Sequence, residues 1–190
     1  LLNINKTKTT FIDLRKENKD RKNSIDYELT YLGYKFIIGY KKDKKNVVKK
    51  PLRILMSDSK FERYINKIKS SFEDFNIEKA KYTSDHSGIN RLLLQRMKFL
   101  TNNFQLVRRK DNVFVGVYYS NEFINDYSNL IELDKILKNQ ITLITPIGKL
   151  TLINKLKQLS FHNGFKEKSF LKFNFRAFQN EKVLKIWKNL

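Results

Sequence analysis

The stretch TYLGYKF, residues 30–36, places a single glycine inside an aromatic, β-prone run. If residues 27–40 form one strand, alternate side chains fall on opposite faces. One face is then almost wholly apolar or aromatic, and we expect it to pack on a core: Thr30, Leu32, Tyr34, Phe36 and Ile38. Gly33 falls on the other face, where it indicates a bend, a sheet edge or a backbone that a ligand approaches closely. We favour the close approach, with a bend as the alternative.

The segments around this run complete a small antiparallel sheet. Residues 7–15 (TKTTFIDLR) are β-prone, and residues 47–56 (VVKKPLRILM) have the pattern of a return strand. Pro51 restricts that strand to an edge or a bulge. At Ser57 the pattern becomes helical. The sequence therefore predicts an α+β fold, with a small antiparallel β-sheet in residues 1–56 and an α-helical bundle in residues 57–190.

Residues 57–76 have the periodicity of an amphipathic helix. Its apolar residues recur on one helix face: Phe61, Ile65, Ile68, Phe72 and Phe75. Ser59 and Glu62 have the S-x-x-E pattern of a capping box, which predicts the start of the helix. A stripe beside the apolar face is basic and consists of Lys60, Arg63 and Lys67.

The carboxyl half is predicted to be rich in helices. Residues 91–103, 122–141, 148–161 and 180–190 have helical patterns. In the second of these we expect the inward set to be Ile124, Tyr127, Leu130, Ile131 and Leu137. Residues 104–121 have two interpretations, a β-hairpin that turns at Asp111 and Asn112 or an extended connector.

The charge of the chain indicates a polyanionic partner. There are 39 basic and 19 acidic residues, a net charge of +20. Nucleic acid is the partner that such an excess favours, ahead of an anionic membrane surface or the ribosome. The absence of cysteine excludes disulfides and thiolate metal sites. No apolar run has the length of a membrane span and no signal-peptide pattern is present, so we expect a cytoplasmic protein with no membrane partner.

The residues, taken alone, indicate no catalytic site and no metal site. His86 and His162 are isolated, and the acidic residues are scattered. Glu73 and Asp74 are adjacent, and we interpret them as solvated helix charges. The stripe of Lys60, Arg63 and Lys67 suits a phosphate backbone, although lysines also serve to keep a helix soluble. Five tyrosines could stack on bases or pack within the protein: Tyr31, Tyr34, Tyr40, Tyr118 and Tyr119.

Two motifs, in order, resemble reverse transcriptases of the bacterial and group II intron kind. LLNINKT, residues 1–7, resembles the end of motif D, and TYLGYKF resembles motif E, the primer grip. In this family both motifs follow the catalytic Y-x-D-D loop of the palm and precede a helical thumb. The later segments RMKFLTNN and VGVYYSN resemble the extensions of antiphage-defence and abortive-infection members.

The resemblance implies the end of a polymerase palm (1–56) and a helical thumb with its extension (57–190). It implies that the catalytic aspartates and their Mg²⁺ lie before Leu1, so that this chain by itself is inactive. Lys6 matches the motif D lysine near the triphosphate, and Leu32, Gly33 and Tyr34 match the primer-grip turn, with the Lys35 ammonium beside it. Lys60, Arg63 and Lys67 would follow a duplex of template and primer.

The implied function is template-primer binding within an RNA-directed DNA polymerase that acts in phage defence. The implied partners are the duplex and the remaining fingers and palm of the same enzyme. The alternative is a stand-alone, non-catalytic basic protein that binds RNA or DNA. The two differ in what precedes Leu1, since we expect an upstream Asp-Asp motif in the first and a gene that starts near Leu1 in the second.

Overall fold

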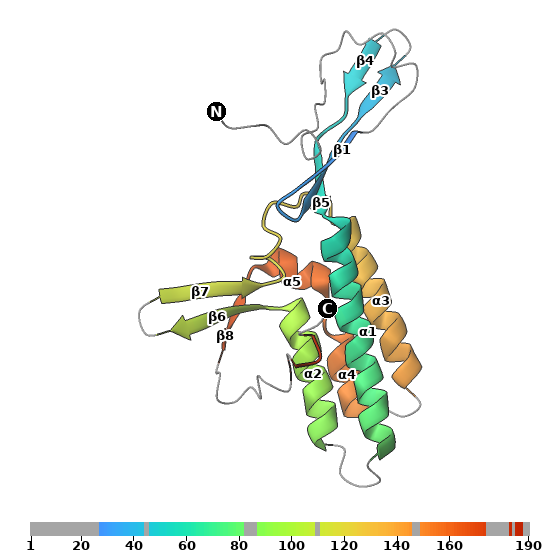
Figure 1. Ribbon diagram of the computed structural model, residues 1–190, viewed down its shortest axis with the longest axis vertical. Coiled ribbons are helices and arrows are strands. Elements are labelled where there is room, and N and C mark those ends of the chain that lie inside the picture. Colours follow the sequence, from blue (N-terminus) through green and yellow to red (C-terminus); the bar gives the residue numbers. More distant parts are fainter. Residues whose placement is uncertain are drawn as a thin grey trace, which may run out of the picture.

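The predicted α+β fold is present, with an antiparallel sheet followed by helices. The structure, a computed structural model, describes residues 27–43, 46–81, 87–108, 111–145, 149–173, 183 and 185–187. The first sheet lies at one end of the molecule, the helices form a bundle beside it, and a second three-stranded sheet projects from the bundle (Figure 1). The motif D stretch, with Lys6, lies outside the described residues.

The run around Gly33 is a β-hairpin and not one strand. Strand β1 (Tyr27–Tyr31) pairs with β2 (Tyr34–Ile38), and β2 pairs with β5 (Arg53–Met56), all antiparallel. Tyr31 lies opposite Tyr34, so Leu32 and Gly33 alone form the turn. Their φ angles of 47° and 78° are the two positive values that a type I′ turn requires. Strands β3 (Tyr40–Asp43) and β4 (Asn46–Lys49) form a separate hairpin.

The predicted inward face of this run was therefore wrong at Leu32. Leu32 is 76% exposed at the turn, whereas Ile37, which falls on the opposite face in the same alternation, is buried. The turn reverses the chain, so the alternation of faces does not continue through it. Gly33 is required for the positive φ of a turn rather than for a bare strand face.

Helix α1 (Asp58–Lys81) follows the sheet directly. Its cap is Ser57 and not the predicted Ser59: the Ser57 hydroxyl accepts a hydrogen bond from the backbone N–H of Lys60 at 3.3 Å. The backbone N–H of Ser57 donates to the carbonyl of Gly33 at 3.0 Å, which ties the hairpin turn to the start of the helix. The predicted apolar face is confirmed, since four of its members are buried and Phe61 packs against them.

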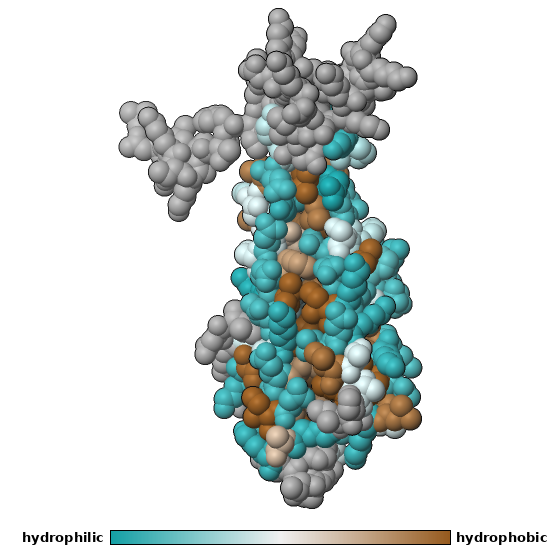
Figure 2. All heavy atoms as spheres, turned by 90° about the vertical axis from the view of Figure 1, so that its right-hand side faces the viewer, coloured by the Kyte–Doolittle hydropathy of each residue, from teal (hydrophilic) through white to brown (hydrophobic). Residues whose placement is uncertain are grey.

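Four further helices complete the bundle: α2 (Ser87–Thr101), α3 (Ser128–Ile144), α4 (Leu150–Lys157) and α5 (Phe161–Glu167). Met56, at the end of β5, belongs to the same buried cluster as the helices, so sheet and bundle share one core. On the predicted inward face of 122–141, Leu130 and Leu137 are buried, but Ile131 is 45% exposed. Figure 2 shows the side formed by α1 and α3, where hydrophobic residues run in a strip between hydrophilic ones.

Of the two interpretations of residues 104–121, the hairpin is the one present, and a third strand pairs with it. Strand β6 (Asn103–Arg108) pairs with β7 (Asp111–Gly116), and Arg108 lies opposite Asp111, so the turn precedes the predicted position. Strand β8 (Phe170–Phe173) pairs with β6 in parallel, which the sequence did not predict. The buried Asn103 side chain links β6 to α5 and to the residue before β8, because its amide donates to the carbonyls of Gly164 and Ser169.

The loop between β7 and α3 fastens the first sheet to the bundle. The Asn125 amide pairs with the backbone of β5, accepting from Ile54 N–H at 2.7 Å and donating to the Leu52 carbonyl at 2.9 Å. Arg53 and Asp126 form an ion pair at 2.6 Å beside it. The same loop carries Ser120 and Phe123, so its attachment fixes both residues against the hairpin turn.

Candidate nucleic-acid interface

The hairpin turn, the first turn of α1 and the β7–α3 loop meet at Lys60. The Lys60 ammonium lies 5.1 Å from the centre of the Tyr34 ring and donates a hydrogen bond to the carbonyl of Ser120. Tyr34 also packs edge-on against Phe123, with ring centres 5.7 Å apart. A Cβ atom on Gly33 would lie 3.7 Å from the Lys60 Cδ. The structure thus brings three predicted residues, Gly33, Tyr34 and Lys60, into one cluster.

The three predicted cations of α1 line a hollow of about 180 Å³, which we call the basic groove. Its lining residues are Lys60, Arg63, Tyr64, Lys67 and Ser120. Burial, and next the positive charge of Arg63, lowers the pKa of Lys60 and of Lys67. In the part of the chain that the structure describes, none of the three cations forms an ion pair. The groove therefore holds partly desolvated positive charge that no carboxylate within the described ranges balances.

A second hollow of about 160 Å³ adjoins the basic groove, because both are lined by Tyr64, Lys67 and Ser120. Its remaining lining residues come from α2 and the second sheet: Phe99, Leu100, Phe104, Val115 and Gly116. Trp187 lies behind it, where its indole N–H donates to the Lys67 carbonyl at 3.2 Å. The Lys67 ammonium lies 5.4 Å from the Trp187 ring centre. Cations and aromatic rings thus meet in one concave surface, a combination that suits phosphates with adjacent sugars or bases.

Sequence reasoning missed the aromatic side of this surface. Phe99 and Phe104 come from the consecutive elements α2 and β6, whereas Trp187 comes from a segment distant in sequence, and no spacing rule connects all three. Their aromatic character was the one available signal. It did not distinguish a core residue from a residue that lines a hollow.

The four predicted residues of the hairpin differ in their surroundings. Lys35 lies 2.8 Å from Glu28 and 3.2 Å from Asp58, and the hydrogen bonds to these carboxylates raise its pKa. Its charge is already balanced, in contrast to Lys60. Leu32 is exposed at the turn and offers only apolar contact.

The tyrosines considered as stacking residues also differ in exposure and in contacts. Tyr31 is 62% exposed, and Tyr34 is held by Lys60 and Phe123. Tyr118 and Tyr119 contact each other edge-on, with ring centres 5.2 Å apart. The side chain of Tyr40 lies outside the described part of the structure.

The acidic residues do not assemble a metal site within the described ranges. No group of three His, Asp or Glu side chains there is arranged to hold a metal ion. Asp74, which we interpreted as a solvated charge, instead pairs with the buried guanidinium of Arg96 at 2.5 Å. His162 packs against the Tyr127 ring, and His86 lies outside the described residues. The expected Mg²⁺ of the full enzyme stays a prediction.

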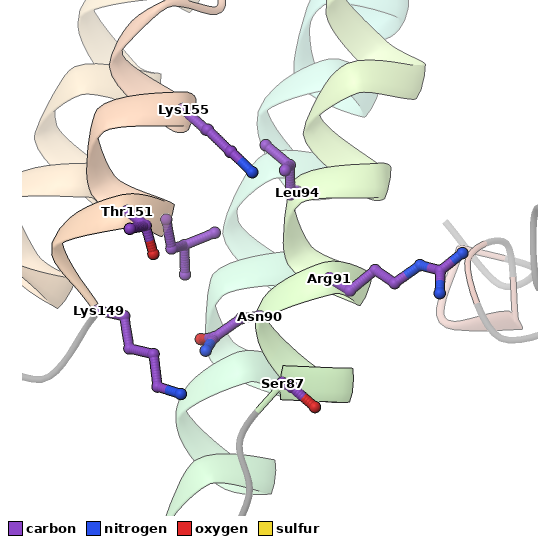
Figure 3. A pocket seen from close by; sticks show the side chains of 8 residues that line it. Ser87, Asn90, Arg91, Leu94, Lys149, Thr151 and Lys155 are labelled. Carbon is purple, nitrogen blue, oxygen red and sulfur yellow. The ribbon is translucent and has the colours of Figure 1, made fainter.

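A further hollow lies at the other end of the bundle, between α2 and α4, with a volume of about 320 Å³. Figure 3 shows the side chains of Asn90, Lys149 and Lys155 directed into the space between the two helices, whereas Arg91 points away. None of the residues that the sequence predicted as functional lines this hollow. The candidate site is therefore the surface that begins at the hairpin turn.

Comparisons with protein-family models, with curated proteins and with solved structures find no match to this chain. No helix in the described ranges is both long and apolar enough to cross a membrane.

Proposed function

We propose that this chain binds a nucleic-acid duplex in the basic groove, as the template-primer-binding part of an RNA-directed DNA polymerase. The observation that carries the proposal is the row of Lys60, Arg63 and Lys67, unpaired within the described structure, beside the Gly33 turn. Successive members of this row are three and four residues apart, so they lie along one side of α1 and can contact successive phosphates of a backbone.

The state of these lysines supports an anionic ligand. Removing an ammonium group from water costs free energy unless an opposite charge or hydrogen bonds compensate. Lys60 has a hydrogen bond to a carbonyl and a ring contact, but no carboxylate among the described residues. A phosphate in the groove would supply the missing opposite charge, and counterions would leave the nucleic acid as it binds.

The assignment to a polymerase rests on the resemblance in motif order and on the local geometry of the hairpin. Leu32 and Gly33 form a tight turn against the first helix of the bundle, the place at which the family has its primer grip. In this proposal the turn positions the primer end, Lys6 lies near the triphosphate, and upstream aspartates bind Mg²⁺ in the missing palm. The full enzyme would work in the cytoplasm, in defence against phage.

Salt-dependent binding tests the groove. We expect the purified chain to bind a labelled RNA–DNA duplex with an affinity that falls steeply with salt. Lys67→Met should weaken binding and reduce the salt slope by roughly one unit. Lys69→Met is the matched control, because Lys69 is an exposed lysine on the same helix, outside the groove. Equal effects of the two substitutions, or binding that salt does not alter, would overturn the proposal.

A second candidate is a non-catalytic protein that binds RNA or DNA by itself. It is favoured by one observation, that four of the five residues lining the basic groove lie on the single helix α1, so its positive charge depends on one element. The sequence encoded immediately before Leu1 separates the two candidates. An Asp-Asp motif there, with primer extension by the longer protein that Lys60→Met reduces, supports the polymerase. Its absence, with tight binding by the chain alone, supports the second candidate.

A further inference from the structure

One face of the second sheet carries a cluster of aromatic rings. Phe114 stacks on Tyr119 with ring centres 5.1 Å apart, and it contacts Phe170 edge-on at 5.0 Å. Tyr118 continues the cluster, since it contacts Tyr119 and packs against Phe165 of α5. The rings come from β7, the loop after it and β8, which only the tertiary fold brings together.

The cluster faces outward, although its residues are apolar. Phe114 is 36% exposed and Phe170 is 44% exposed. The strand register places both on the same face of the sheet, because Phe114 lies opposite Gln105 and Phe170 lies opposite Asn103. The sheet that carries these rings projects from the helical bundle (Figure 1). Val113 and Leu171 lie on the opposite face and are exposed as well.

A lysine in an unfavourable backbone conformation lies over the cluster. Lys168, at the end of α5, has a φ of 52°, a left-handed value that favours glycine or asparagine. Its ammonium lies 4.7 Å from the centre of the Tyr118 ring. The charges around the rings are mixed, since Glu122 contacts the Tyr118 hydroxyl at 3.5 Å and Lys166 lies over Tyr127. Because glycine or asparagine would suit this backbone better, a lysine here indicates a role for its side chain.

The cluster lies beside the basic groove but not on the same face of the second sheet as the adjoining hollow. Phe104 and Val115, which line that hollow, pair with each other and lie on the face opposite Phe114. Tyr119 is followed by Ser120, whose carbonyl accepts the hydrogen bond from Lys60 and which lines the groove. A strand that leaves the groove would therefore pass the edge strand β7 to reach the exposed rings.

We propose that this aromatic cluster, composed of Phe114, Tyr119 and Phe170 with Lys168 beside it, stacks the unpaired bases of a single strand that leaves the basic groove. The proposal rests on the proposed function, because the strand is the extension of the duplex bound there. Every base has a flat π face, so exposed rings at such spacing accept bases with little regard to sequence. The Lys168 ammonium would contact a phosphate of the same strand.

Three labelled duplexes test the stacking with the full 190-residue chain. One is blunt, one carries a short thymine overhang, and one carries an abasic overhang of equal length with the same phosphates. We expect the thymine overhang to bind about tenfold more tightly than the abasic one. Phe114→Leu with Phe170→Leu should remove this difference and leave blunt-duplex binding unchanged. Val113→Ala with Leu171→Ala, on the opposite face, should retain it, and circular dichroism confirms that each variant is folded.

Equal binding of thymine and abasic overhangs by the unaltered chain would overturn the proposal. So would a thymine preference that survives the paired Phe→Leu substitutions. Neither result affects the proposed function, which fails instead if Lys67→Met leaves blunt-duplex affinity and its salt slope unchanged.

Lys168→Gly separates a structural role from a binding role. Glycine suits the left-handed backbone, so we expect the midpoint of urea denaturation to rise. The affinity for both overhangs should fall to the same degree, because a phosphate contact is lost and the rings remain. A rise in the midpoint with unchanged overhang affinity would show that the lysine has no role in binding.

Discussion

The Cδ atom of Lys60 lies 3.7 Å from the point that a Cβ atom on Gly33 would occupy. Gly33 lies in a β-turn and Lys60 in a helix. A hydrogen bond of 3.0 Å from the Ser57 backbone N–H to the Gly33 carbonyl keeps the turn beside the start of that helix. The turn and the first cation of α1 are thus one structural unit. A change of conformation in the hairpin turn would displace the start of the basic groove.

The Gly33 position should not tolerate alanine. Its φ of 78° costs an L-residue about 1 kcal/mol, whereas the space around it allows a methyl group at ordinary contact distance. We expect Gly33→Ala to lower the free energy of unfolding in urea, and Gly33→Asn to lower it less. Gly88→Ala is the control, because Gly88 lies in a helix with open space around it and should tolerate or favour alanine. Full stability of Gly33→Ala would contradict the turn.

Stability should depend on the charge of Lys67 in the direction set by its lowered pKa. When the pKa is lower in the folded state than in the unfolded state, the folded state is penalised wherever the lysine is charged. The penalty is complete below the folded pKa and disappears as pH rises toward the ordinary 10.5. Lys67→Met should therefore unfold at higher urea concentration than the unaltered chain at neutral pH, with a difference that vanishes near pH 10.5.

Lys69→Met is the control for that experiment, since Lys69 is exposed and lies on the same helix. Its stability should follow that of the unaltered chain across the same pH range. A loss of stability in Lys67→Met at neutral pH would mean that the contact with Trp187 outweighs the cost of desolvation.

Trp187 should report on occupation of the groove. It is the single tryptophan of the chain, it is 6% exposed, and it contacts Lys67 through both its ring and its N–H. A phosphate that draws the Lys67 ammonium away from the ring should change the fluorescence of the indole. We expect a saturable change on titration with duplex and a smaller one in Lys67→Met. Identical titrations of the two proteins would contradict this placement.

Replacing only one member of the Arg96–Asp74 ion pair should lower the free energy of unfolding more than replacing both. Arg96 is 2% exposed, and its guanidinium has Asp74 as its charged partner at 2.5 Å. Asp74→Ala should lower the free energy of unfolding by about 3 kcal/mol, because the buried guanidinium loses its ion pair with the Asp74 carboxylate. Replacing both residues, as Arg96→Met with Asp74→Leu, should cost less than the single change. Additive losses in a double-mutant cycle would contradict this coupling.

Local patterns were sufficient for the elements that depend on neighbours in sequence. The spacing from Phe61 to Phe75 predicted α1 and its buried face, and the β-prone run around Gly33 predicted strand structure there. The run around Asp111 allowed a hairpin, with an extended connector as the other interpretation. The sequence pattern also predicted that the sheet ends and the helix begins at Ser57. In each case the deciding interaction lies within a few residues of the chain.

The sequence by itself determined the α+β class, the amphipathic α1 and an excess of positive charge. The tertiary structure decided which of those charges pair with a carboxylate and which do not. Lys35 and Lys60 looked alike in sequence, but the pairing of β1 with β2 and the start of α1 bring Glu28 and Asp58 to Lys35, while Lys60 meets a ring and a carbonyl. Likewise, β8 brings Phe170 to Phe114 from a distant segment. Ion pairs and ring contacts depend on distances between segments far apart in the chain, and periodicity along one segment carries no information about them.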